Sequence, residues 1–220
     1  MRADPVGVRC LRCRASAIHL AMRRALGDHV AAIGSSDVCE FSAHGPFARF
    51  LSRAARSASF SEYFADIEPG AFRGGIRCED LQRLTYRDAT FDVVTHTEVL
   101  EHVADDACAL RELHRVLRPG GMMLFTVPLH DGATTVERAR LRDGDGIEHL
   151  RDPVYHLDPL RPEGILAFRD YGRDIVDRVI AAGFVGVRIM EVDCVPWLSG
   201  VPVLIAYKGL KVFPCSVPDS

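Results

Sequence analysis

Residues 91–128 read FDVVTHTEVLEHVADDACALRELHRVLRPGGMMLFTVP, and they decide the fold of this 220-residue chain. Phe91–Thr95 is typical of a buried strand, because Val93 and Val94 stand in an unbroken apolar run. Asp105 or Asp106 can then cap a helix. The expected helix has one apolar stripe, formed by Ala109, Leu110, Leu113, Val116 and Leu117.

The LRPGG sequence at Leu117–Gly121 ends this helix. Proline disfavours helix in the residue before it, and glycine permits the left-handed turn that sends the chain back. Met122–Val127 therefore predicts a second strand. A strand, a helix and a second strand in this order form half of a nucleotide-binding α/β sheet.

The same alternation extends toward the N-terminus. Ser16–Leu26 predicts a first helix, and the apolar Val38–Phe41 predicts a strand that runs into a turn of small residues at Ser42–Pro46. Pro46 suits the first turn of the next helix. The apolar residues of that helix recur at helical spacing and are Phe47, Phe50, Leu51 and Ala54. Two short strands follow, one ending near Ser59–Glu62 and one at Ile76–Cys78.

Downstream, the pattern changes. Residues 128–170 fit no simple period, so we expect a cap or lid with short helices over the sheet edge. Tyr171–Ala182 predicts a helix closed by Gly183. Val185–Val192 and Val201–Tyr207 predict an antiparallel hairpin, because a parallel pair would need a longer crossover.

Strands that alternate with helices predict a parallel sheet covered on both faces, which is the doubly wound, Rossmann-like class of α/β fold. The length allows one sizeable core and is short for two domains, so we interpret the chain as a single domain. Its expected parts are an N-terminal arm and helix (1–30), a cofactor-binding core (31–127), the cap (128–170), and a C-terminal helix with antiparallel strands (171–220).

Composition narrows the choice of partners. The net charge of -3 at pH 7 argues against a nucleic-acid partner, which normally needs a basic surface. Seven cysteines, an odd number, favour a reducing compartment over a small secreted fold. No apolar run approaches the ~20 residues of a membrane span, so we expect a cytoplasmic protein without a membrane partner. Trp197 is expected to pack against the C-terminal hairpin or its rim.

Cys10 and Cys13 have the spacing of half a zinc site, to which His19 or Cys39 could contribute. No second cysteine pair stands at a credible distance. Two ordinary thiols are the better interpretation, and we expect no metal.

The chemistry should lie at one edge of the sheet. In an open parallel sheet the ligand binds beyond the carboxyl ends of the strands. Glu62 stands 22 residues after Glu40, near the usual spacing for a carboxylate that accepts both hydroxyl hydrogens of a ribose. Asp80 could accept a hydrogen from the exocyclic amine of an adenine, with Leu81 packing on its ring.

Three stretches resemble class I S-adenosylmethionine-dependent methyltransferases of the small-molecule type: FDVVTHTEVLEHV (Phe91–Val103), LRPGG (Leu117–Gly121) and EDLQRLTYRDATFD (Glu79–Asp92). The resemblance covers residues 36–128 well and the C-terminal strands loosely. It implies a seven-stranded sheet whose last strand is antiparallel, S-adenosyl-L-methionine as cofactor, and a small-molecule or glycan-like acceptor. The resemblance, together with the positions of these residues at the predicted strand ends, assigns the following residues to the cofactor site: Glu40, Ser42, Gly45, Glu62, Tyr63, Asp80, Leu81, His96, Thr97, Glu98 and His102.

The first turn departs from the family pattern. The family's first strand runs into E-x-G-x-G-x-G, whereas this chain reads EFSAHGP from Glu40 to Pro46. Ser42, His44 and Pro46 stand where glycine would let the backbone approach the cofactor. Two alternatives therefore stay open: a methyltransferase whose turn takes another shape, or a catalytically inactive methyltransferase-like binding or scaffold protein. A nicotinamide oxidoreductase is disfavoured, because the turn lacks the pyrophosphate glycines.

Methyl transfer is an in-line displacement at the methyl carbon of a sulfonium, so the protein mainly supplies alignment and excludes water. A base is needed only if the nucleophile carries a proton of high pKa. His130, directly after the fifth strand, is the first candidate for a catalytic base, followed by His156 and then Asp131. Each could instead be a structural or surface residue. Glu98 and Glu101 could orient a ligand or cap the start of a helix.

Overall fold

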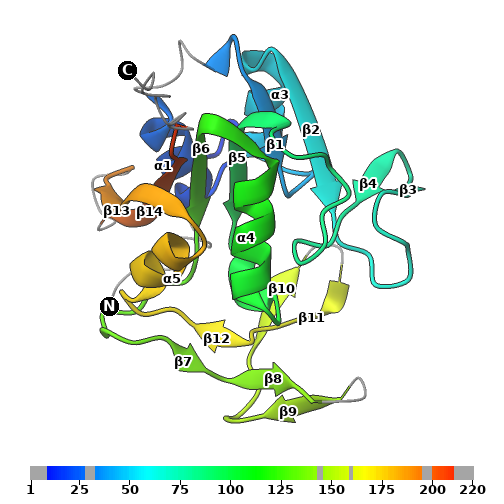
Figure 1. Ribbon diagram of the computed structural model, residues 1–220, viewed down its shortest axis with the longest axis vertical. Helices are drawn as coiled ribbons and strands as arrows, with labels where there is room; N and C mark the ends of the chain where they lie inside the picture. Colours follow the sequence, from blue (N-terminus) through cyan, green and yellow to red (C-terminus); the bar gives the residue numbers. More distant parts are fainter. Residues whose placement is uncertain (1–8, 28–32, 143–145, 159–160, 195–199, 211–220) are drawn as a thin grey trace, which may run out of the picture.

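The computed structural model describes residues 9–27, 33–142, 146–158, 161–194 and 200–210. Among these residues the largest sheet has eight strands, in the order β13–β14–β6–β5–β1–β2–β4–β3 (Figure 1). Its strands are β1 (Asp37–Glu40), β2 (Ser57–Glu62), β3 (Phe72–Arg73), β4 (Ile76–Cys78), β5 (Phe91–Thr97), β6 (Leu117–Thr126), β13 (Phe184–Val192) and β14 (Val201–Lys208).

Five neighbouring strands of the sheet, β6, β5, β1, β2 and β4, run parallel to one another. The last strand of the chain, β14, runs antiparallel to them. β1 pairs in parallel with β2 and β5, β2 with β4, and β5 with β6. β14 is antiparallel to both of its neighbours, β6 and β13. This confirms the Rossmann-like α/β class with an antiparallel last strand. The additional strand β3 is two residues long and pairs antiparallel with β4 at the edge.

Helices cover both faces of this sheet. α1 (Ala17–Ala25) and α3 (Pro46–Ala54) share a core with Val93 on one face. α4 (Asp106–Val116) and α5 (Ile175–Ala181) share a core with Val94 on the other. Neighbouring residues of a strand point to opposite faces, so the apolar pair in β5 fills both cores.

Capping residues set where the helices begin. Ser16 caps α1 with its side chain. The Asp105 carboxylate caps α4 by accepting a hydrogen bond from the Cys108 N–H at 2.8 Å. α3 begins at Pro46, whose fixed φ suits a first helical turn. These starts confirm the sequence-based predictions.

α5 is shorter than predicted. Its expected start at Tyr171 is wrong, since the helix begins at Ile175. Tyr171 instead forms a parallel bridge with Leu129, and its hydroxyl donates to Asp106 at 3.0 Å. These contacts hold Tyr171 outside the helix. Gly183, with φ of 103°, follows the helix as predicted.

The short helices predicted within residues 128–170 are also wrong, because the described part of this segment forms strands. They make three two-stranded sheets, β7 with β12, β8 with β9, and β10 with β11. The strands are β7 (Val136–Glu137), β8 (Ala139–Leu141), β9 (Ile147–His149), β10 (Tyr155–Asp158), β11 (Arg161–Leu166) and β12 (Arg169–Asp170). Figure 1 shows them gathered beyond the end of α4 at which that helix begins. Strands this short have no extended hydrophobic period that a sequence pattern could reveal.

No helix in the described ranges is long and apolar enough to cross a membrane. The position predicted for Trp197 lies outside the described residues.

Candidate functional site

Glu40 ends β1 and lies inside the sheet. It is 1% exposed, and its carboxyl group accepts a hydrogen bond from the hydroxyl of Thr95 on β5. Burial raises the pKa of Glu40 to about 8, because desolvation disfavours the charged form. Glu40 therefore links β1 to β5 inside the sheet as a largely neutral carboxyl group.

The turn after β1 is tied to the end of β2. The Ala43 N–H donates to Glu62 Oε1 at 2.8 Å, and the Ser42 hydroxyl donates to the His44 carbonyl at 3.3 Å. Burial raises the pKa of Glu62. Gly45 has φ of 101° and ψ of 178°, a conformation that is essentially restricted to glycine. The turn thus needs this one glycine, and its bond to Glu62 uses one oxygen of that carboxylate, Oε1.

After β4, two neighbouring carboxylates have different surroundings. Glu79 is 3% exposed and accepts the Thr85 N–H at 2.8 Å, which closes its own loop. Asp80 is half-buried and accepts the Gln82 N–H at 2.9 Å. Leu81 is 6% exposed and belongs to the core under this turn. Asp80 is therefore the carboxylate of this turn that a ligand could reach.

The residues at the end of β5 separate into core and edge. His96 is fully buried, and its ring packs against that of Phe125 at an angle of 30°, with 4.8 Å between the ring centroids. Neither of its ring nitrogens has a hydrogen-bond partner among the described residues, and burial lowers its pKa to about 3. Thr97 is half-buried, and Glu98 has φ of 51°, which is uncommon for a residue other than glycine. The structure thus places Thr97 and Glu98 at the edge and leaves His96 in the core.

Next along the chain, Glu101 and His102 meet a residue far away in the sequence. They lie in a short 3-10 helix (Leu100–His102), and His156 lies on β10. Glu101 Oε1 is 3.6 Å from His102 Nε2 and 3.5 Å from His156 Nδ1. The two imidazole rings meet edge to face, with 4.9 Å between their centroids. We call Glu101, His102 and His156 the Glu101 cluster.

The electrostatic environments of the two histidines differ. Burial lowers the pKa of His102, whereas the Glu101 carboxylate raises the pKa of the more exposed His156. Each of these three side chains offers one atom that could bind a metal ion, and the three atoms lie within 4.8 Å of one another. Among the described residues, this is the one such group of three or more His, Cys, Asp or Glu side chains.

The pair β10 and β11 joins the ends of two distant strands. His156 on β10 contacts Glu101 after β5. On β11, the guanidinium of Arg161 donates to the Tyr63 carbonyl, directly after β2, and to the Asp158 carboxylate. Tyr63 itself is 50% exposed. These contacts place β10 and β11 beside the edge at which a ligand of the sheet would bind.

Ion pairs and hydrogen bonds attach residues 128–170 to the start of α4. Arg169 is 4% exposed and donates to the Val103 carbonyl at 2.6 Å and the Ala104 carbonyl at 2.7 Å. Its Nε also donates to Glu137 at 3.1 Å. Arg178 of α5 donates to Glu137 and to Asp106, each at 2.9 Å. These bonds fix the segment that carries His156.

His130 lies in the loop after β6, where its Nδ1 accepts the Gly132 N–H at 2.9 Å. Its Nε2 is buried and has no hydrogen-bond partner in the described residues. His130 is outside the Glu101 cluster, and Asp131 beside it is exposed. The structure thus brings His156, but not His130, together with His102.

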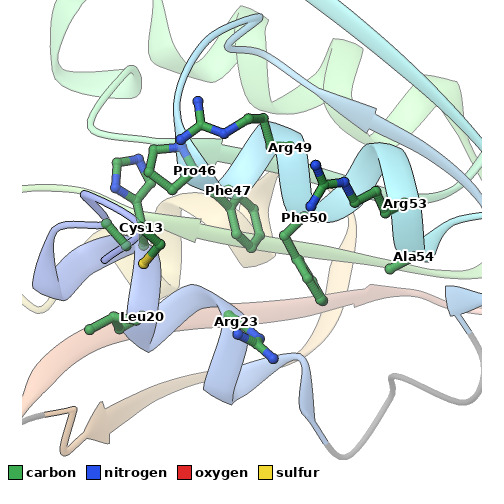
Figure 2. A pocket seen from close by; sticks show the side chains of 11 residues that line it. Cys13, Leu20, Arg23, Pro46, Phe47, Arg49, Phe50, Arg53 and Ala54 are labelled. Carbon is green, nitrogen blue, oxygen red and sulfur yellow. The ribbon is translucent and has the colours of Figure 1, made fainter. Parts of the chain in front are cut away.

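A separate pocket of about 400 Å³ lies between α1 and α3. Figure 2 shows Phe47 and Phe50 between the two helices, with Arg23 on one side and Arg49 and Arg53 on the other. The first residue of α3 lines it, but none of the residues predicted to bind the cofactor does.

The half zinc site predicted as an alternative at Cys10 and Cys13 finds no third ligand among the described residues. Cys39, one possible contributor, is fully buried in β1, and burial raises the pKa of its thiol.

Sequence reasoning treated Glu101, His102 and His156 separately and missed that they form one cluster. The chain separates His102 from His156 by more than 50 residues, and the segment between them has no periodic pattern. The adjacent Glu101 and His102 offered the one local signal, a carboxylate and an imidazole at a strand end.

Residues 42–125 match a family model described as a methyltransferase domain. The demethylmenaquinone methyltransferase of Mycolicibacterium paratuberculosis is 34% identical over 117 residues, which cover 50% of this chain and 49% of that protein. The ubiquinone biosynthesis O-methyltransferase of Parvibaculum lavamentivorans is 45% identical over 49 residues, which cover 22% of this chain and 19% of that protein. The chain thus spans about half the length of the first relative and less of the second.

Solved structures share the fold at low sequence identity. The 1,6-didemethyltoxoflavin-N1-methyltransferase of Burkholderia thailandensis, with bound 1,6-didemethyltoxoflavin and S-adenosylhomocysteine, has a TM-score of 0.54 at 21% identity, covering 86% of this chain and 78% of that one. An S-adenosylmethionine-dependent methyltransferase from Mesorhizobium loti has a TM-score of 0.53 at 16% identity, covering 84% and 98%. The [4+2]-cyclase SpnF has a TM-score of 0.52 at 17% identity, covering 95% and 88%. A cyclase among these neighbours means that the fold alone does not determine the reaction.

Proposed function

We propose that this protein, a class I S-adenosylmethionine-dependent methyltransferase, transfers the methyl group of its cofactor S-adenosyl-L-methionine to a small-molecule or glycan-like acceptor. The observation that carries the proposal is the position of Glu62. This carboxylate ends β2 and is held by the Ala43 N–H of the turn after β1 at 2.8 Å. A carboxylate at this place in a doubly wound sheet is suited to accept the hydrogens of ribose hydroxyls.

The other residues at the sheet edge fit the same cofactor. Asp80 is half-buried above the apolar Leu81, a combination that suits the amine and the ring of an adenine. Gly45 keeps the conformation that only glycine adopts without strain, although serine and histidine replace glycines elsewhere in the turn. Glu62, Asp80 and the turn at Gly45 would therefore hold the cofactor. Thr97 and Glu98 would line the next part of the site.

When bound, the cofactor supplies an activated methyl group. The residues of this chain bind and orient the two reactants and exclude water from them. The acceptor would bind between the sheet edge and residues 128–170, which would act as the cap. His156 faces this side from β10, and His130 follows β6. The names of the curated relatives, which include quinone-precursor methyltransferases, support an acceptor of small size.

Calorimetric titration with S-adenosylhomocysteine tests the proposal directly. We expect the wild-type chain to bind this product, and Glu62→Gln to bind it about tenfold more weakly, because a hydrogen bond to a charged acceptor contributes about 1.5 to 3 kcal/mol. Asp80→Asn should weaken binding in the same direction. Glu68→Gln is the matched control, since Glu68 is an exposed carboxylate whose side chain is 91% accessible. Absence of binding to the wild type at millimolar ligand would refute the proposal.

The altered turn favours one second candidate, a binding or scaffold protein that retains the fold without catalysis. Ser42, His44 and Pro46 in the place of three glycines are the observation behind it. Such a protein could still bind S-adenosylhomocysteine. Transfer of a labelled methyl group from S-adenosyl-L-methionine to any member of a panel of phenols, catechols and amines would exclude it.

A further inference from the structure

We propose that the Glu101 cluster binds a divalent transition-metal ion, with Glu101 Oε1, His102 Nε2 and His156 Nδ1 as its ligands and an acceptor oxygen as a further ligand. One carboxylate and two imidazoles form a donor set typical of divalent iron, manganese, cobalt or zinc. The sequence had indicated no metal at these positions. Three features of the cluster carry the assignment.

The first feature is the tautomer of His102. Its Nδ1 lies 2.8 Å from the Leu166 carbonyl oxygen, which can only accept a hydrogen bond. Nδ1 must therefore carry the proton, and in the neutral ring Nε2 presents a lone pair. That lone pair lies 3.6 Å from Glu101 Oε1, so two electron-rich atoms are near each other. A bound cation would turn this repulsion into coordination.

The second feature is the isolation of the Glu101 carboxylate. Glu101 is fully buried, and neither of its carboxylate oxygens has a hydrogen-bond donor among the described residues. A buried carboxylate without donors is costly, and such groups are normally paired or bound to a metal. His156 lies 3.5 Å away, which is longer than the ~2.7 to 2.9 Å of a charge-assisted hydrogen bond.

The third feature is the spacing of the three atoms. Ligands about 2.1 Å from a tetrahedral metal ion are separated from one another by about 3.4 Å. The separations of 3.6 and 3.5 Å from Glu101 Oε1 match this edge closely, and all three atoms lie within 4.8 Å of one another. Coordination would then require the two imidazole nitrogens, which lie within 4.8 Å of each other, to approach this same separation.

The surroundings also hold these ligands in place, as is common around bound metals. The Phe168 N–H donates to the Glu101 carbonyl at 2.8 Å, and the Leu166 carbonyl orients the His102 ring. The side chains of Glu101 and His102 are 0% and 11% exposed, whereas that of His156 is 34% exposed. The site therefore has two buried ligands on one side and opens to solvent at His156, where an acceptor could enter.

For catalysis, this inference rests on the proposed function. A hydroxyl oxygen of the acceptor that binds the cation would lose its proton to water at a lower pH than it does in solution. The oxygen would then attack the methyl carbon of the sulfonium. A carbon–oxygen bond forms, the carbon–sulfur bond breaks with its electron pair on sulfur, and S-adenosylhomocysteine leaves. In this scheme His156 is a metal ligand and not a base.

Titration of Mn²⁺ into the chelator-treated protein, followed by the electron paramagnetic resonance of free Mn²⁺, tests the site without any turnover. Manganese is suitable because it disfavours thiolate ligands, and the chain has seven cysteines. We expect one bound ion per chain. We expect binding to weaken at least about tenfold in Glu101→Gln and in His156→Gln, since even partners of ligands contribute this much.

Two controls separate the cluster from nonspecific binding. His149→Gln and Glu163→Gln change exposed residues of the same types in the same segment and should bind Mn²⁺ as the wild type does. Circular dichroism of each variant confirms the fold, and the half-exposed His156 gives a variant that should fold normally. No binding to the wild type at millimolar Mn²⁺, or equal binding by all variants, would overturn the proposal.

Calorimetry with S-adenosylhomocysteine on the same samples distinguishes this failure from failure of the proposed function. If S-adenosylhomocysteine binds and Mn²⁺ does not, only the metal site is refuted. If Mn²⁺ binds and S-adenosylhomocysteine does not, the metal site remains and the methyltransferase assignment is refuted.

Discussion

Glu40 and Asp106 are both buried carboxyl groups, one within the central sheet and one where residues 128–170 attach to it. Glu40 is 1% exposed and accepts a hydrogen bond from a hydroxyl, that of Thr95. Asp106 is 6% exposed and accepts from the Tyr171 hydroxyl at 3.0 Å and from Arg178 at 2.9 Å. In the sheet, burial raises the pKa of the Glu40 carboxyl group, whereas at the attachment the Asp106 carboxyl group forms an ion pair with Arg178.

This difference extends to the two regions as wholes. The sheet lies between two large apolar cores. The described part of residues 128–170 has one small apolar cluster, of Ala139, Leu166 and Phe168. Its attachment therefore depends on ion pairs and on hydrogen bonds to backbone carbonyls. Loss of apolar volume should therefore destabilise the sheet, whereas loss of charge should destabilise the attachment of residues 128–170.

The largest expected effect breaks the attachment. Arg169→Met should lower the free energy of unfolding by about 3 to 5 kcal/mol, because it leaves the Val103 and Ala104 carbonyls without their donor and removes one of the two arginines that pair with Glu137. Urea denaturation measures this loss, and hydrogen exchange should rise most within residues 128–170. Arg173→Met, at an exposed position, should change the stability by less than about 0.5 kcal/mol. A small effect of Arg169→Met would mean that the ion pairs do not anchor the segment.

The second effect tests the sheet. Leu110→Ala removes a fully buried side chain of α4 and should cost about 3 to 4 kcal/mol, because the cavity cannot collapse completely. Leu157→Ala is the same substitution on β10, at a residue that is 96% exposed, and should be nearly neutral. Thermal or urea unfolding of both variants compares the two regions with one chemical change. Equal losses would show that Leu157 is buried in solution.

The contrast between the two regions also explains what the sequence could predict. β5 and α4 follow local rules: an apolar run, a capping aspartate and the LRPGG sequence lie next to the residues that they organise. LRPGG ends α4 as predicted, but it forms the first half of β6 and not a turn before a strand that starts at Met122. The strands of residues 128–170 depend on partners far along the chain, such as Glu137 opposite Arg169, and no local period encodes that pairing.

For the site, strand order and spacing predicted the carboxylates at the ends of β2 and β4, because parallel strands end at one edge. The burial of His96 was missed, since its position in β5 gives no signal about the face toward which it points. The contact of His156 with Glu101 and His102 was missed because it depends on how β10 and β11 fold back.

The third effect depends on pH. Burial raises the pKa of Glu40 from the model-peptide value of 4.5 to about 8, so the folded protein keeps a proton that the unfolded chain has released. The stability that this group contributes is therefore complete below pH 4.5 and falls as the pH rises through about 8. Glu40→Gln keeps the acceptor for Thr95 and removes the titration. Relative to this variant, the wild type should lose about 3 kcal/mol between pH 5 and pH 8.

Urea denaturation of the two proteins at several pH values measures that difference. Asp106→Asn is the matched control in the other region, because it removes a charge that is paired with Arg178 and should destabilise the protein throughout this pH range. A constant gap between wild type and Glu40→Gln would mean that Glu40 is charged in the folded protein.

The smallest effect lies at the turn after β1, where we propose that the cofactor binds. Gly45→Ala forces an L-residue into φ of 101°, and should cost about 1 to 2 kcal/mol. The added Cβ would lie 3.6 Å from His19 Nε2, an ordinary contact, so the cost comes from the backbone and not from a collision. Gly27→Ala is the control, because that position has no heavy atom within 4 Å of the added Cβ. The same turn holds the Ala43 N–H against Glu62. Gly45→Ala should therefore also weaken the binding of S-adenosylhomocysteine measured by calorimetry, whereas Gly27→Ala should not. If Gly45→Ala lowers stability and leaves that affinity unchanged, the glycine serves the fold alone and the cofactor approaches the sheet elsewhere.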